Sequence, residues 1–163
     1  MKTAIGGVPS AKELGRAHPF LQGLGAAHMK TLADCAMRIK FSAGESIFRQ
    51  GEIANRFYVI LQGKVLLEAH DKAVPIETLG KGEVLGWSWL FPPYTLHFAA
   101  RAIEPTSAIF FYGTWLRERC EADHDFGYEL IKRFSAVVID RLQCTLCGWW
   151  LRIPQTDQVN GCA

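Results

Sequence analysis

Seven short runs of β-forming residues follow one another between residues 36 and 112 of this 163-residue chain. They are rich in Ile, Val, Phe and Tyr, and they read MRIKF, SIFRQ, RFYVIL, KVLLEAH, VPIETL, AARAIE and TSAIFFY. Turn-forming stretches separate them, for example SAGE at 42–45 and GKGE at 80–83. Short strands at this spacing predict an all-β sandwich or barrel and argue against βαβ units. Gln62-Gly63 predicts a hairpin between the third and fourth runs, because Gly accepts the positive φ of a tight turn.

The pattern changes to helical spacing after residue 112. An amphipathic helix is predicted from about residue 124 to 147, with Asp123 or Asp125 as its cap. Its polar-apolar pattern repeats at three- and four-residue steps through Phe126, Leu130, Phe134, Val137, Val138, Leu142 and Thr145. Ile131 and Ile139 widen the apolar stripe beyond what a barrel alone would cover. This width predicts a partner helix and therefore a homodimer, whose interface we expect to contain Phe134, Val138 and Leu142.

These patterns divide the chain into three parts. Residues 1–17 are expected to be a flexible N-terminal segment and residues 148–163 a tail. Residues 18–147 are expected to form one domain, with its barrel at about 36–112 and its C-helix at about 124–147. Short helical patterns also lie in AKELGRAHPF and LGAAHMKTLADCA, with three candidate buried residues, Leu14, Met29 and Leu32.

Composition supports a single globular domain, since 49% of the residues are hydrophobic and 21% are charged. No apolar run approaches the roughly 18–20 residues of a membrane-spanning helix, and MKTAIGGVPS has no secretory apolar region. We therefore expect no membrane partner. The net charge is +2, and the Lys and Arg residues are spread along the chain. A nucleic-acid-binding protein would instead show a strongly basic face. The five cysteines, an odd number, predict reduced thiols in a cytoplasmic protein.

Two longer stretches, FSAGESIFRQGEIANRFYVILQGKVLL and LGKGEVLGWSWLF, together with RLQ in the C-helix, resemble the cyclic-nucleotide-binding domain family. The nearest type is the effector domain of catabolite-activator-type bacterial transcription regulators. The likeness covers about residues 18–147 and rests mainly on five glycines, Gly44, Gly51, Gly63, Gly82 and Gly86. It implies a double-stranded β-helix (jelly roll) barrel with N-terminal helices and a long C-terminal helix. In that family a helical turn begun at a glycine holds the cyclic phosphate, and the C-helix mediates dimerisation.

The phosphate-binding segment departs from the family pattern of Gly-Glu followed by Arg. Gly86 matches, but Trp87 stands at the Glu position and Leu96 at the Arg position, within one residue either way. A buried anion without a partner costs several kcal/mol, whereas a helix N-terminus contributes at most about 2 kcal/mol. The segment therefore predicts a degenerate pocket, more apolar than the family's, and argues against ordinary cyclic AMP affinity.

The resemblance also places Thr145 of RLQCT where related regulators contact the base. The candidate pocket therefore consists of Gly86, Trp87, Ser88, Thr95, Leu96, His97 and Thr145. The sequence indicates no resident cofactor, and a cyclic nucleotide or another small effector is the expected ligand. The expected function is a regulatory ligand sensor that signals through its dimerising C-helix to a downstream protein the sequence does not identify.

An alternative is a ligand-free interaction module, in which Trp87, Trp89 and Leu96 fill the pocket. An enzyme is not expected, because the chain has no nucleophile–base pair, P-loop or dinucleotide fingerprint. A metal-binding jelly roll would need His-x-His after a strand glycine, which is absent here, so no metal site is expected.

Cys144 and Cys147 form a lone CxxC near the end of the predicted helix, where helix packing is the favoured role. A redox or interchain role is the alternative. The few residues after RLQCTL are too short for a helix-turn-helix module, so we expect no specific DNA binding by this chain.

Overall fold

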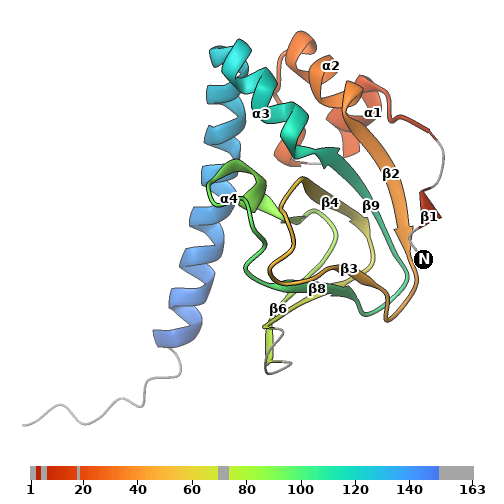
Figure 1. The fold of residues 1–163 in the computed structure, drawn as a ribbon, viewed down its shortest axis with the longest axis vertical. Helices are drawn as coiled ribbons and strands as arrows, with labels where there is room; N and C mark the ends of the chain where they lie inside the picture. Colours follow the sequence, from red (N-terminus) through yellow and green to blue (C-terminus); the bar gives the residue numbers. More distant parts are fainter. Residues whose placement is uncertain (1–2, 5–6, 18, 70–73, 151–163) are drawn as a thin grey trace, which may run out of the picture.

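Two antiparallel sheets form a barrel in the computed structural model, which describes residues 3–4, 7–17, 19–69 and 74–150 (Figure 1). One sheet has the strand order β1-β2-β9-β4-β7 and the other β3-β8-β5-β6. The strands are β1 (Thr3–Ala4), β2 (Ala36–Phe41), β3 (Ser46–Phe48), β4 (Arg56–Gln62), β5 (Val65–Ala69), β6 (Val74–Leu79), β7 (Val84–Leu85), β8 (Ala99–Ala102) and β9 (Thr106–Tyr112). All seven predicted runs are strands, and the predicted jelly-roll barrel is confirmed.

The helices gather at one end and along one side of this barrel (Figure 1). They are α1 (Ala11–Ala17), η1 (Pro19–Leu21), α2 (Ala26–Asp34), η3 (Trp87–Leu90), α3 (Gly113–Ala122) and α4 (His124–Trp150), where η denotes a 3-10 helix. The expectation of a flexible segment at 1–17 is wrong for residues 11–17. These residues form α1, and Leu14 is fully buried in the core, as are Leu32 and, nearly, Met29.

Gln62-Gly63 does not form a hairpin, contrary to the prediction. β4 pairs with β7 and β9, whereas β5 pairs with β6 and β8, so the chain crosses between the sheets here. Gly63 has a φ of +98°, and a Cβ there would lie 2.5 Å from the Oγ1 of Thr106. Glycine is therefore required at this crossover both for its backbone conformation and for lack of space.

The core joins the barrel to the first half of α4. The helix is capped by Asp123, whose Oδ1 accepts a hydrogen bond of 3.0 Å from the backbone N–H of Phe126. Phe134 packs edge-on against Phe20 and Phe57, with ring centroids 5.0 and 5.1 Å away. Its side chain is only 2% exposed. The expectation that Phe134 lies at a dimer interface is wrong, because the residue is covered within the monomer.

Candidate functional site

Residues 86–98, which we call the cassette segment, begin where β7 ends. Gly86 has a left-handed conformation with φ of +82° and directly precedes η3. A Cβ at this position would come within 3.0 Å of the carbonyl oxygen of Arg56. A glycine is thus required for the chain to turn sharply from β7 into η3.

Trp89 anchors the cassette segment to the core. Its side chain is fully buried, stacks on Phe57 at 5.4 Å and meets Phe134 of α4 edge-on at 5.6 Å. Arg117 of α3 donates a 2.6 Å hydrogen bond to the Trp89 carbonyl oxygen and lies 3.9 Å from the ring centre of Tyr94. These contacts fix the segment against both α3 and α4.

A hollow of about 310 Å³ lies between the cassette segment and α4. Of the seven predicted pocket residues, those that line it are Gly86, Trp87, Ser88, Leu96, His97 and Thr145. Thr95 is not among the lining residues, because it forms a β-bridge with Ile53 instead. The volume is at the lower end of the range for small-molecule sites.

The plugged-pocket alternative is wrong for Trp89, which lies in the core. Trp87 and Leu96 stand at the wall and leave the hollow open. The lining is mainly apolar, as expected, and includes side chains that the sequence analysis did not assign to a site: Phe48, Leu67, Ile76, Leu85 and Phe98. Val138 and Leu142 of α4, expected at the dimer interface, also line this hollow.

Two charged residues in the hollow were missed by sequence reasoning. Arg141 of α4 and Glu77 of β6 both line it. The guanidinium of Arg141 lies 4.6 Å from the ring centre of Trp87 and donates a hydrogen bond to the carbonyl oxygen of Val84 in β7. The hollow therefore has an ionic group after all, supplied by the C-helix rather than by the cassette segment.

Burial sets the electrostatics of this guanidinium. Desolvation lowers the pKa of Arg141 from its ordinary value, while the carboxylates of Glu77 and Glu83 act in the opposite direction. Neither carboxylate forms an ion pair with it in the described part of the chain. Arg141 is thus a cation in an apolar wall, stabilised by an indole face and by a backbone carbonyl.

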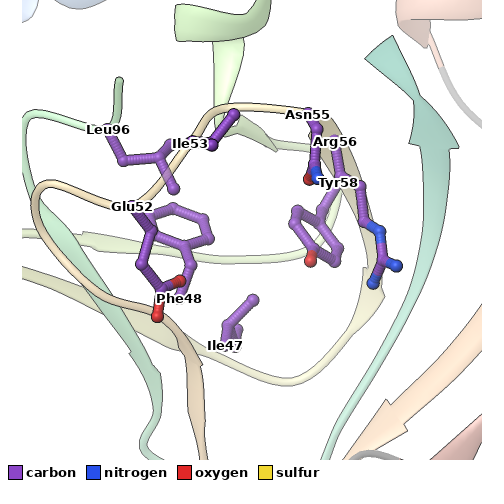
Figure 2. A pocket seen from close by; sticks show the side chains of 8 residues that line it. All are labelled: Ile47, Phe48, Glu52, Ile53, Asn55, Arg56, Tyr58 and Leu96. Atoms are coloured by element: carbon purple, nitrogen blue, oxygen red, sulfur yellow. The ribbon is translucent and has the colours of Figure 1, made fainter. Parts of the chain in front are cut away.

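A second, smaller cavity of about 60 Å³ adjoins the hollow, with Phe48 and Leu96 lining both. Figure 2 shows Arg56 and Tyr58 on the side of this cavity away from Leu96. The guanidinium of Arg56 lies over the rings of Phe110 and Tyr112, at 4.9 and 5.5 Å. Such a volume holds a few waters and is too small for a nucleotide.

The second half of α4 exposes apolar side chains. Val138 is 40% exposed and Leu142 is 56% exposed. Together with exposed apolar residues earlier and later on α4 they form a stripe along one side of the helix, which we call the outer stripe: Tyr128, Ile131, Val138, Ile139, Leu142 and Leu146. Phe134 is not part of it.

Cys144 and Cys147 are free and exposed, so the favoured packing role does not hold within the monomer. Among the residues described, no group of three or more His, Cys, Asp and Glu side chains could hold a metal ion. Cys162 and the rest of 151–163 lie outside the described residues. None of the described helices is long and apolar enough to span a membrane.

Comparison with known proteins identifies the family. A sequence model described as cyclic nucleotide-binding domain matches residues 38–123, which is more than half of the chain. The chain is 34% identical over 68 residues to a cAMP-dependent protein kinase regulatory subunit of Schizosaccharomyces pombe, a match that covers 42% of this chain and 16% of that protein.

Solved structures agree on the fold. A cyclic nucleotide-binding domain from Methylobacillus flagellatus has a TM-score of 0.77 and 14% identity, over 96% of this chain and 90% of the other. The catabolite activator protein of Thermus thermophilus has a TM-score of 0.63 and 21% identity, over 82% of this chain and 62% of the other. By its sequence and its barrel, this chain belongs to the cyclic nucleotide-binding domain family.

Proposed function

We propose that the chain is a non-catalytic regulatory domain that binds a small effector between the cassette segment and α4 and relays binding through the second half of α4. The observation that carries this proposal is that α4 itself forms one wall of the hollow, through Val138, Arg141, Leu142 and Thr145. An effector in the hollow therefore contacts both the barrel and the helix. Such a ligand shifts the position of α4 if it fits one position better than another.

The relay requires something to respond to α4, and the outer stripe supports a second copy of this chain. Tyr128 and Ile131 are three residues apart, Ile131 and Val138 are seven apart, and Leu142 and Leu146 follow at four-residue steps, which is compatible with helices that pair along an apolar seam. Val138 and Leu142 belong both to the stripe and to the lining of the hollow. A ligand there would change the seam directly, and a downstream protein would read the changed dimer.

The cassette segment argues for a ligand other than cyclic AMP, or for weak binding of it. Trp87 and Leu96 stand at the positions where the family pattern has Glu and Arg, and both line the hollow. Neither offers a charge to a ribose or a cyclic phosphate. The odd number of cysteines supports a cytoplasmic location for this function.

Blocking the hollow tests the proposal. Thr145→Trp would place an indole in the hollow from an exposed helix position, and Gln143→Trp is the matched control, because Gln143 is exposed but is not part of the lining. We expect at least one compound in a panel of cyclic AMP, cyclic GMP, nucleosides and small apolar acids to raise the melting temperature. This rise should persist in Gln143→Trp and vanish in Thr145→Trp. A panel without any rise, or a rise that survives Thr145→Trp, would count against the proposal.

A further inference from the structure

Arg141 has more hydrogen-bonding capacity than the protein uses. A guanidinium has five N–H donors in one plane. In the described part of the chain Arg141 makes a single hydrogen bond, to the Val84 carbonyl oxygen, and its guanidinium carbon lies over the ring of Trp87. The remaining donors along the edge of this guanidinium have no hydrogen-bond acceptor among the described residues, so they are available to a ligand in the hollow.

The acceptor that fits such an edge is a planar or tetrahedral anion. Carboxylates and phosphates accept two parallel N–H bonds from one guanidinium, and these charge-assisted bonds are stronger than neutral ones. In an apolar wall they are also less weakened by water. Leu67, Leu96 and Val138 provide apolar surface elsewhere in the same hollow.

Glu77 sets a limit on what can bind. Its carboxylate lines the same hollow and attracts Arg141 from a distance without forming an ion pair with it. An anion that reaches Arg141 is repelled by Glu77, and this repulsion grows with the charge of the ligand. Glu83 also attracts Arg141, but it is not part of the lining of the hollow. One of its carboxylate oxygens accepts a 2.6 Å hydrogen bond from the Gly80 backbone N–H.

We propose that the hollow binds a small organic anion whose charged group, a carboxylate or a phosphate, is held by Arg141 of α4 while its apolar body lies against the barrel wall. This inference rests on the proposed function and adds the chemical class of the effector. It also places the charged end of the ligand on the moving helix and not on the cassette segment. The anion takes donors of Arg141 that the Val84 carbonyl does not use, so a bound ligand adds a contact between α4 and the barrel.

Pairs of compounds that differ in charge test this without any change to the protein. The pairs are hexanoate and hexanamide, phenyl phosphate and phenol, and cyclic AMP and adenosine. We expect the anion of at least one pair to bind at least tenfold more tightly than its neutral partner in calorimetric titrations. The first two pairs distinguish carboxylate from phosphate recognition, and the third tests a cyclic phosphate in particular. Equal affinity within every pair would overturn the inference.

Two substitutions with opposite expected effects on anion affinity then test whether Arg141 and Glu77 cause the preference for anions. Arg141→Gln should weaken binding of the preferred anion at least tenfold and leave its neutral partner unchanged, with Arg141→Lys intermediate. Glu77→Gln should strengthen anion binding a few-fold, because it removes the repelling charge. The control is Arg38→Gln on β2, outside the hollow, which removes one positive charge from an exposed ion pair with Glu13 of α1.

The outcomes separate the two proposals. If a neutral compound binds and Thr145→Trp blocks it, while no anion is preferred, the inference fails and the proposed function stands. If the preferred anion binds equally well to Arg141→Gln and to the natural protein, the inference fails as well. If Arg141→Gln does not fold, Arg141→Lys and the charge pairs on the natural protein decide. If no compound is blocked by Thr145→Trp, the proposed function itself fails.

Discussion

The two halves of α4 carry apolar residues at the same four-residue spacing, from Phe126 to Leu142, but the rest of the chain buries this row only in the first half. In residues 124–137, Phe126, Leu130 and Phe134 are at most 2% exposed. In residues 138–147, Val138 and Leu142 are 40% and 56% exposed, although their spacing continues the same pattern. The folding of one chain does not explain why the apolar residues continue along α4 beyond the part that packs on the core.

The difference separates stability from function within one helix. The first half closes the core at the point where Trp89 of the cassette segment meets Phe134. The second half carries the wall of the hollow and four of the six outer-stripe residues, Val138, Ile139, Leu142 and Leu146, so changes there should alter binding and association more than folding. Each test below asks whether this separation holds.

The largest effect is expected at Phe134. Phe134→Ala removes a buried ring that contacts Phe20, Phe57 and Trp89. It should lower the free energy of unfolding by about 3–5 kcal/mol, through lost burial and the cavity left behind. Urea denaturation of the dilute protein measures this change. A loss below about 1 kcal/mol would mean that the first half of α4 is not part of the core.

Thiol labelling compares the two halves by chemistry. Cys120 of α3 packs against the first half of α4. The two helices are so close here that a Cβ added to Gly127 would lie 3.1 Å from the Cβ of Cys120. Burial, followed by the charges of Asp123 and Glu121, raises the pKa of Cys120 from 9.0 to about 11. At pH 8 the reactive thiolate of Cys120 is then about a hundredfold rarer than that of a cysteine whose pKa is 9.0. The exposed Cys144 and Cys147 should react with iodoacetamide at least a hundredfold faster, as followed by peptide mass spectrometry.

The control for this labelling is the unfolded protein in denaturant, where the thiols should react at similar rates. Because the folded pKa of Cys120 exceeds its unfolded value, its contribution to stability is complete below about pH 9 and is lost as the pH rises toward 11. Labelling of Cys120 as fast as Cys144 in the folded protein would show that the first half opens readily.

A charge on the outer stripe should act on association alone. Ile139→Glu should raise the dissociation constant of the dimer at least tenfold in sedimentation equilibrium, because it buries a carboxylate in an apolar seam. Cys144→Glu is the matched control, since Cys144 is exposed on the opposite side of the same helix and is not part of the lining of the hollow. A natural protein that stays monomeric when concentrated, or equal effects of both substitutions, would contradict the proposed dimer.

The sequence predicts the barrel well because strand signals are local. Runs such as RFYVIL at 56–61 carry their own β-forming residues and turn boundaries. β1 and β7 have two residues each, too few for any period to be visible. The hairpin predicted at Gly63 fails for a different reason: a glycine reveals the turn, but it does not reveal which strands pair across it.

The candidate site is predicted only where the family pattern marks it. Gly86 and its neighbours follow from the resemblance. Arg141 belongs to the RLQ stretch of the C-helix, but the sequence gives it no role in the site, because a basic residue in a helical pattern looks like part of a solvated face. Its contact with Val84, 57 positions earlier, exists only after α4 has docked on the barrel. Phe134 was misplaced for the same reason, since periodicity defines a helix face without saying what covers it.

The smallest effect is expected from Leu142→Ala, the exposed counterpart of Phe134→Ala. Leu142 is 56% exposed, and leucine and alanine have similar helix propensity, so the dilute protein should lose no more than about 0.5 kcal/mol of stability. At higher concentration the natural protein should melt at a higher temperature, because dimerisation favours the folded state, and Leu142→Ala should lose part of this gain. Melting curves over a hundredfold concentration range measure both effects. A large loss in the dilute protein would place Leu142 in the core and remove the distinction between the two halves of α4.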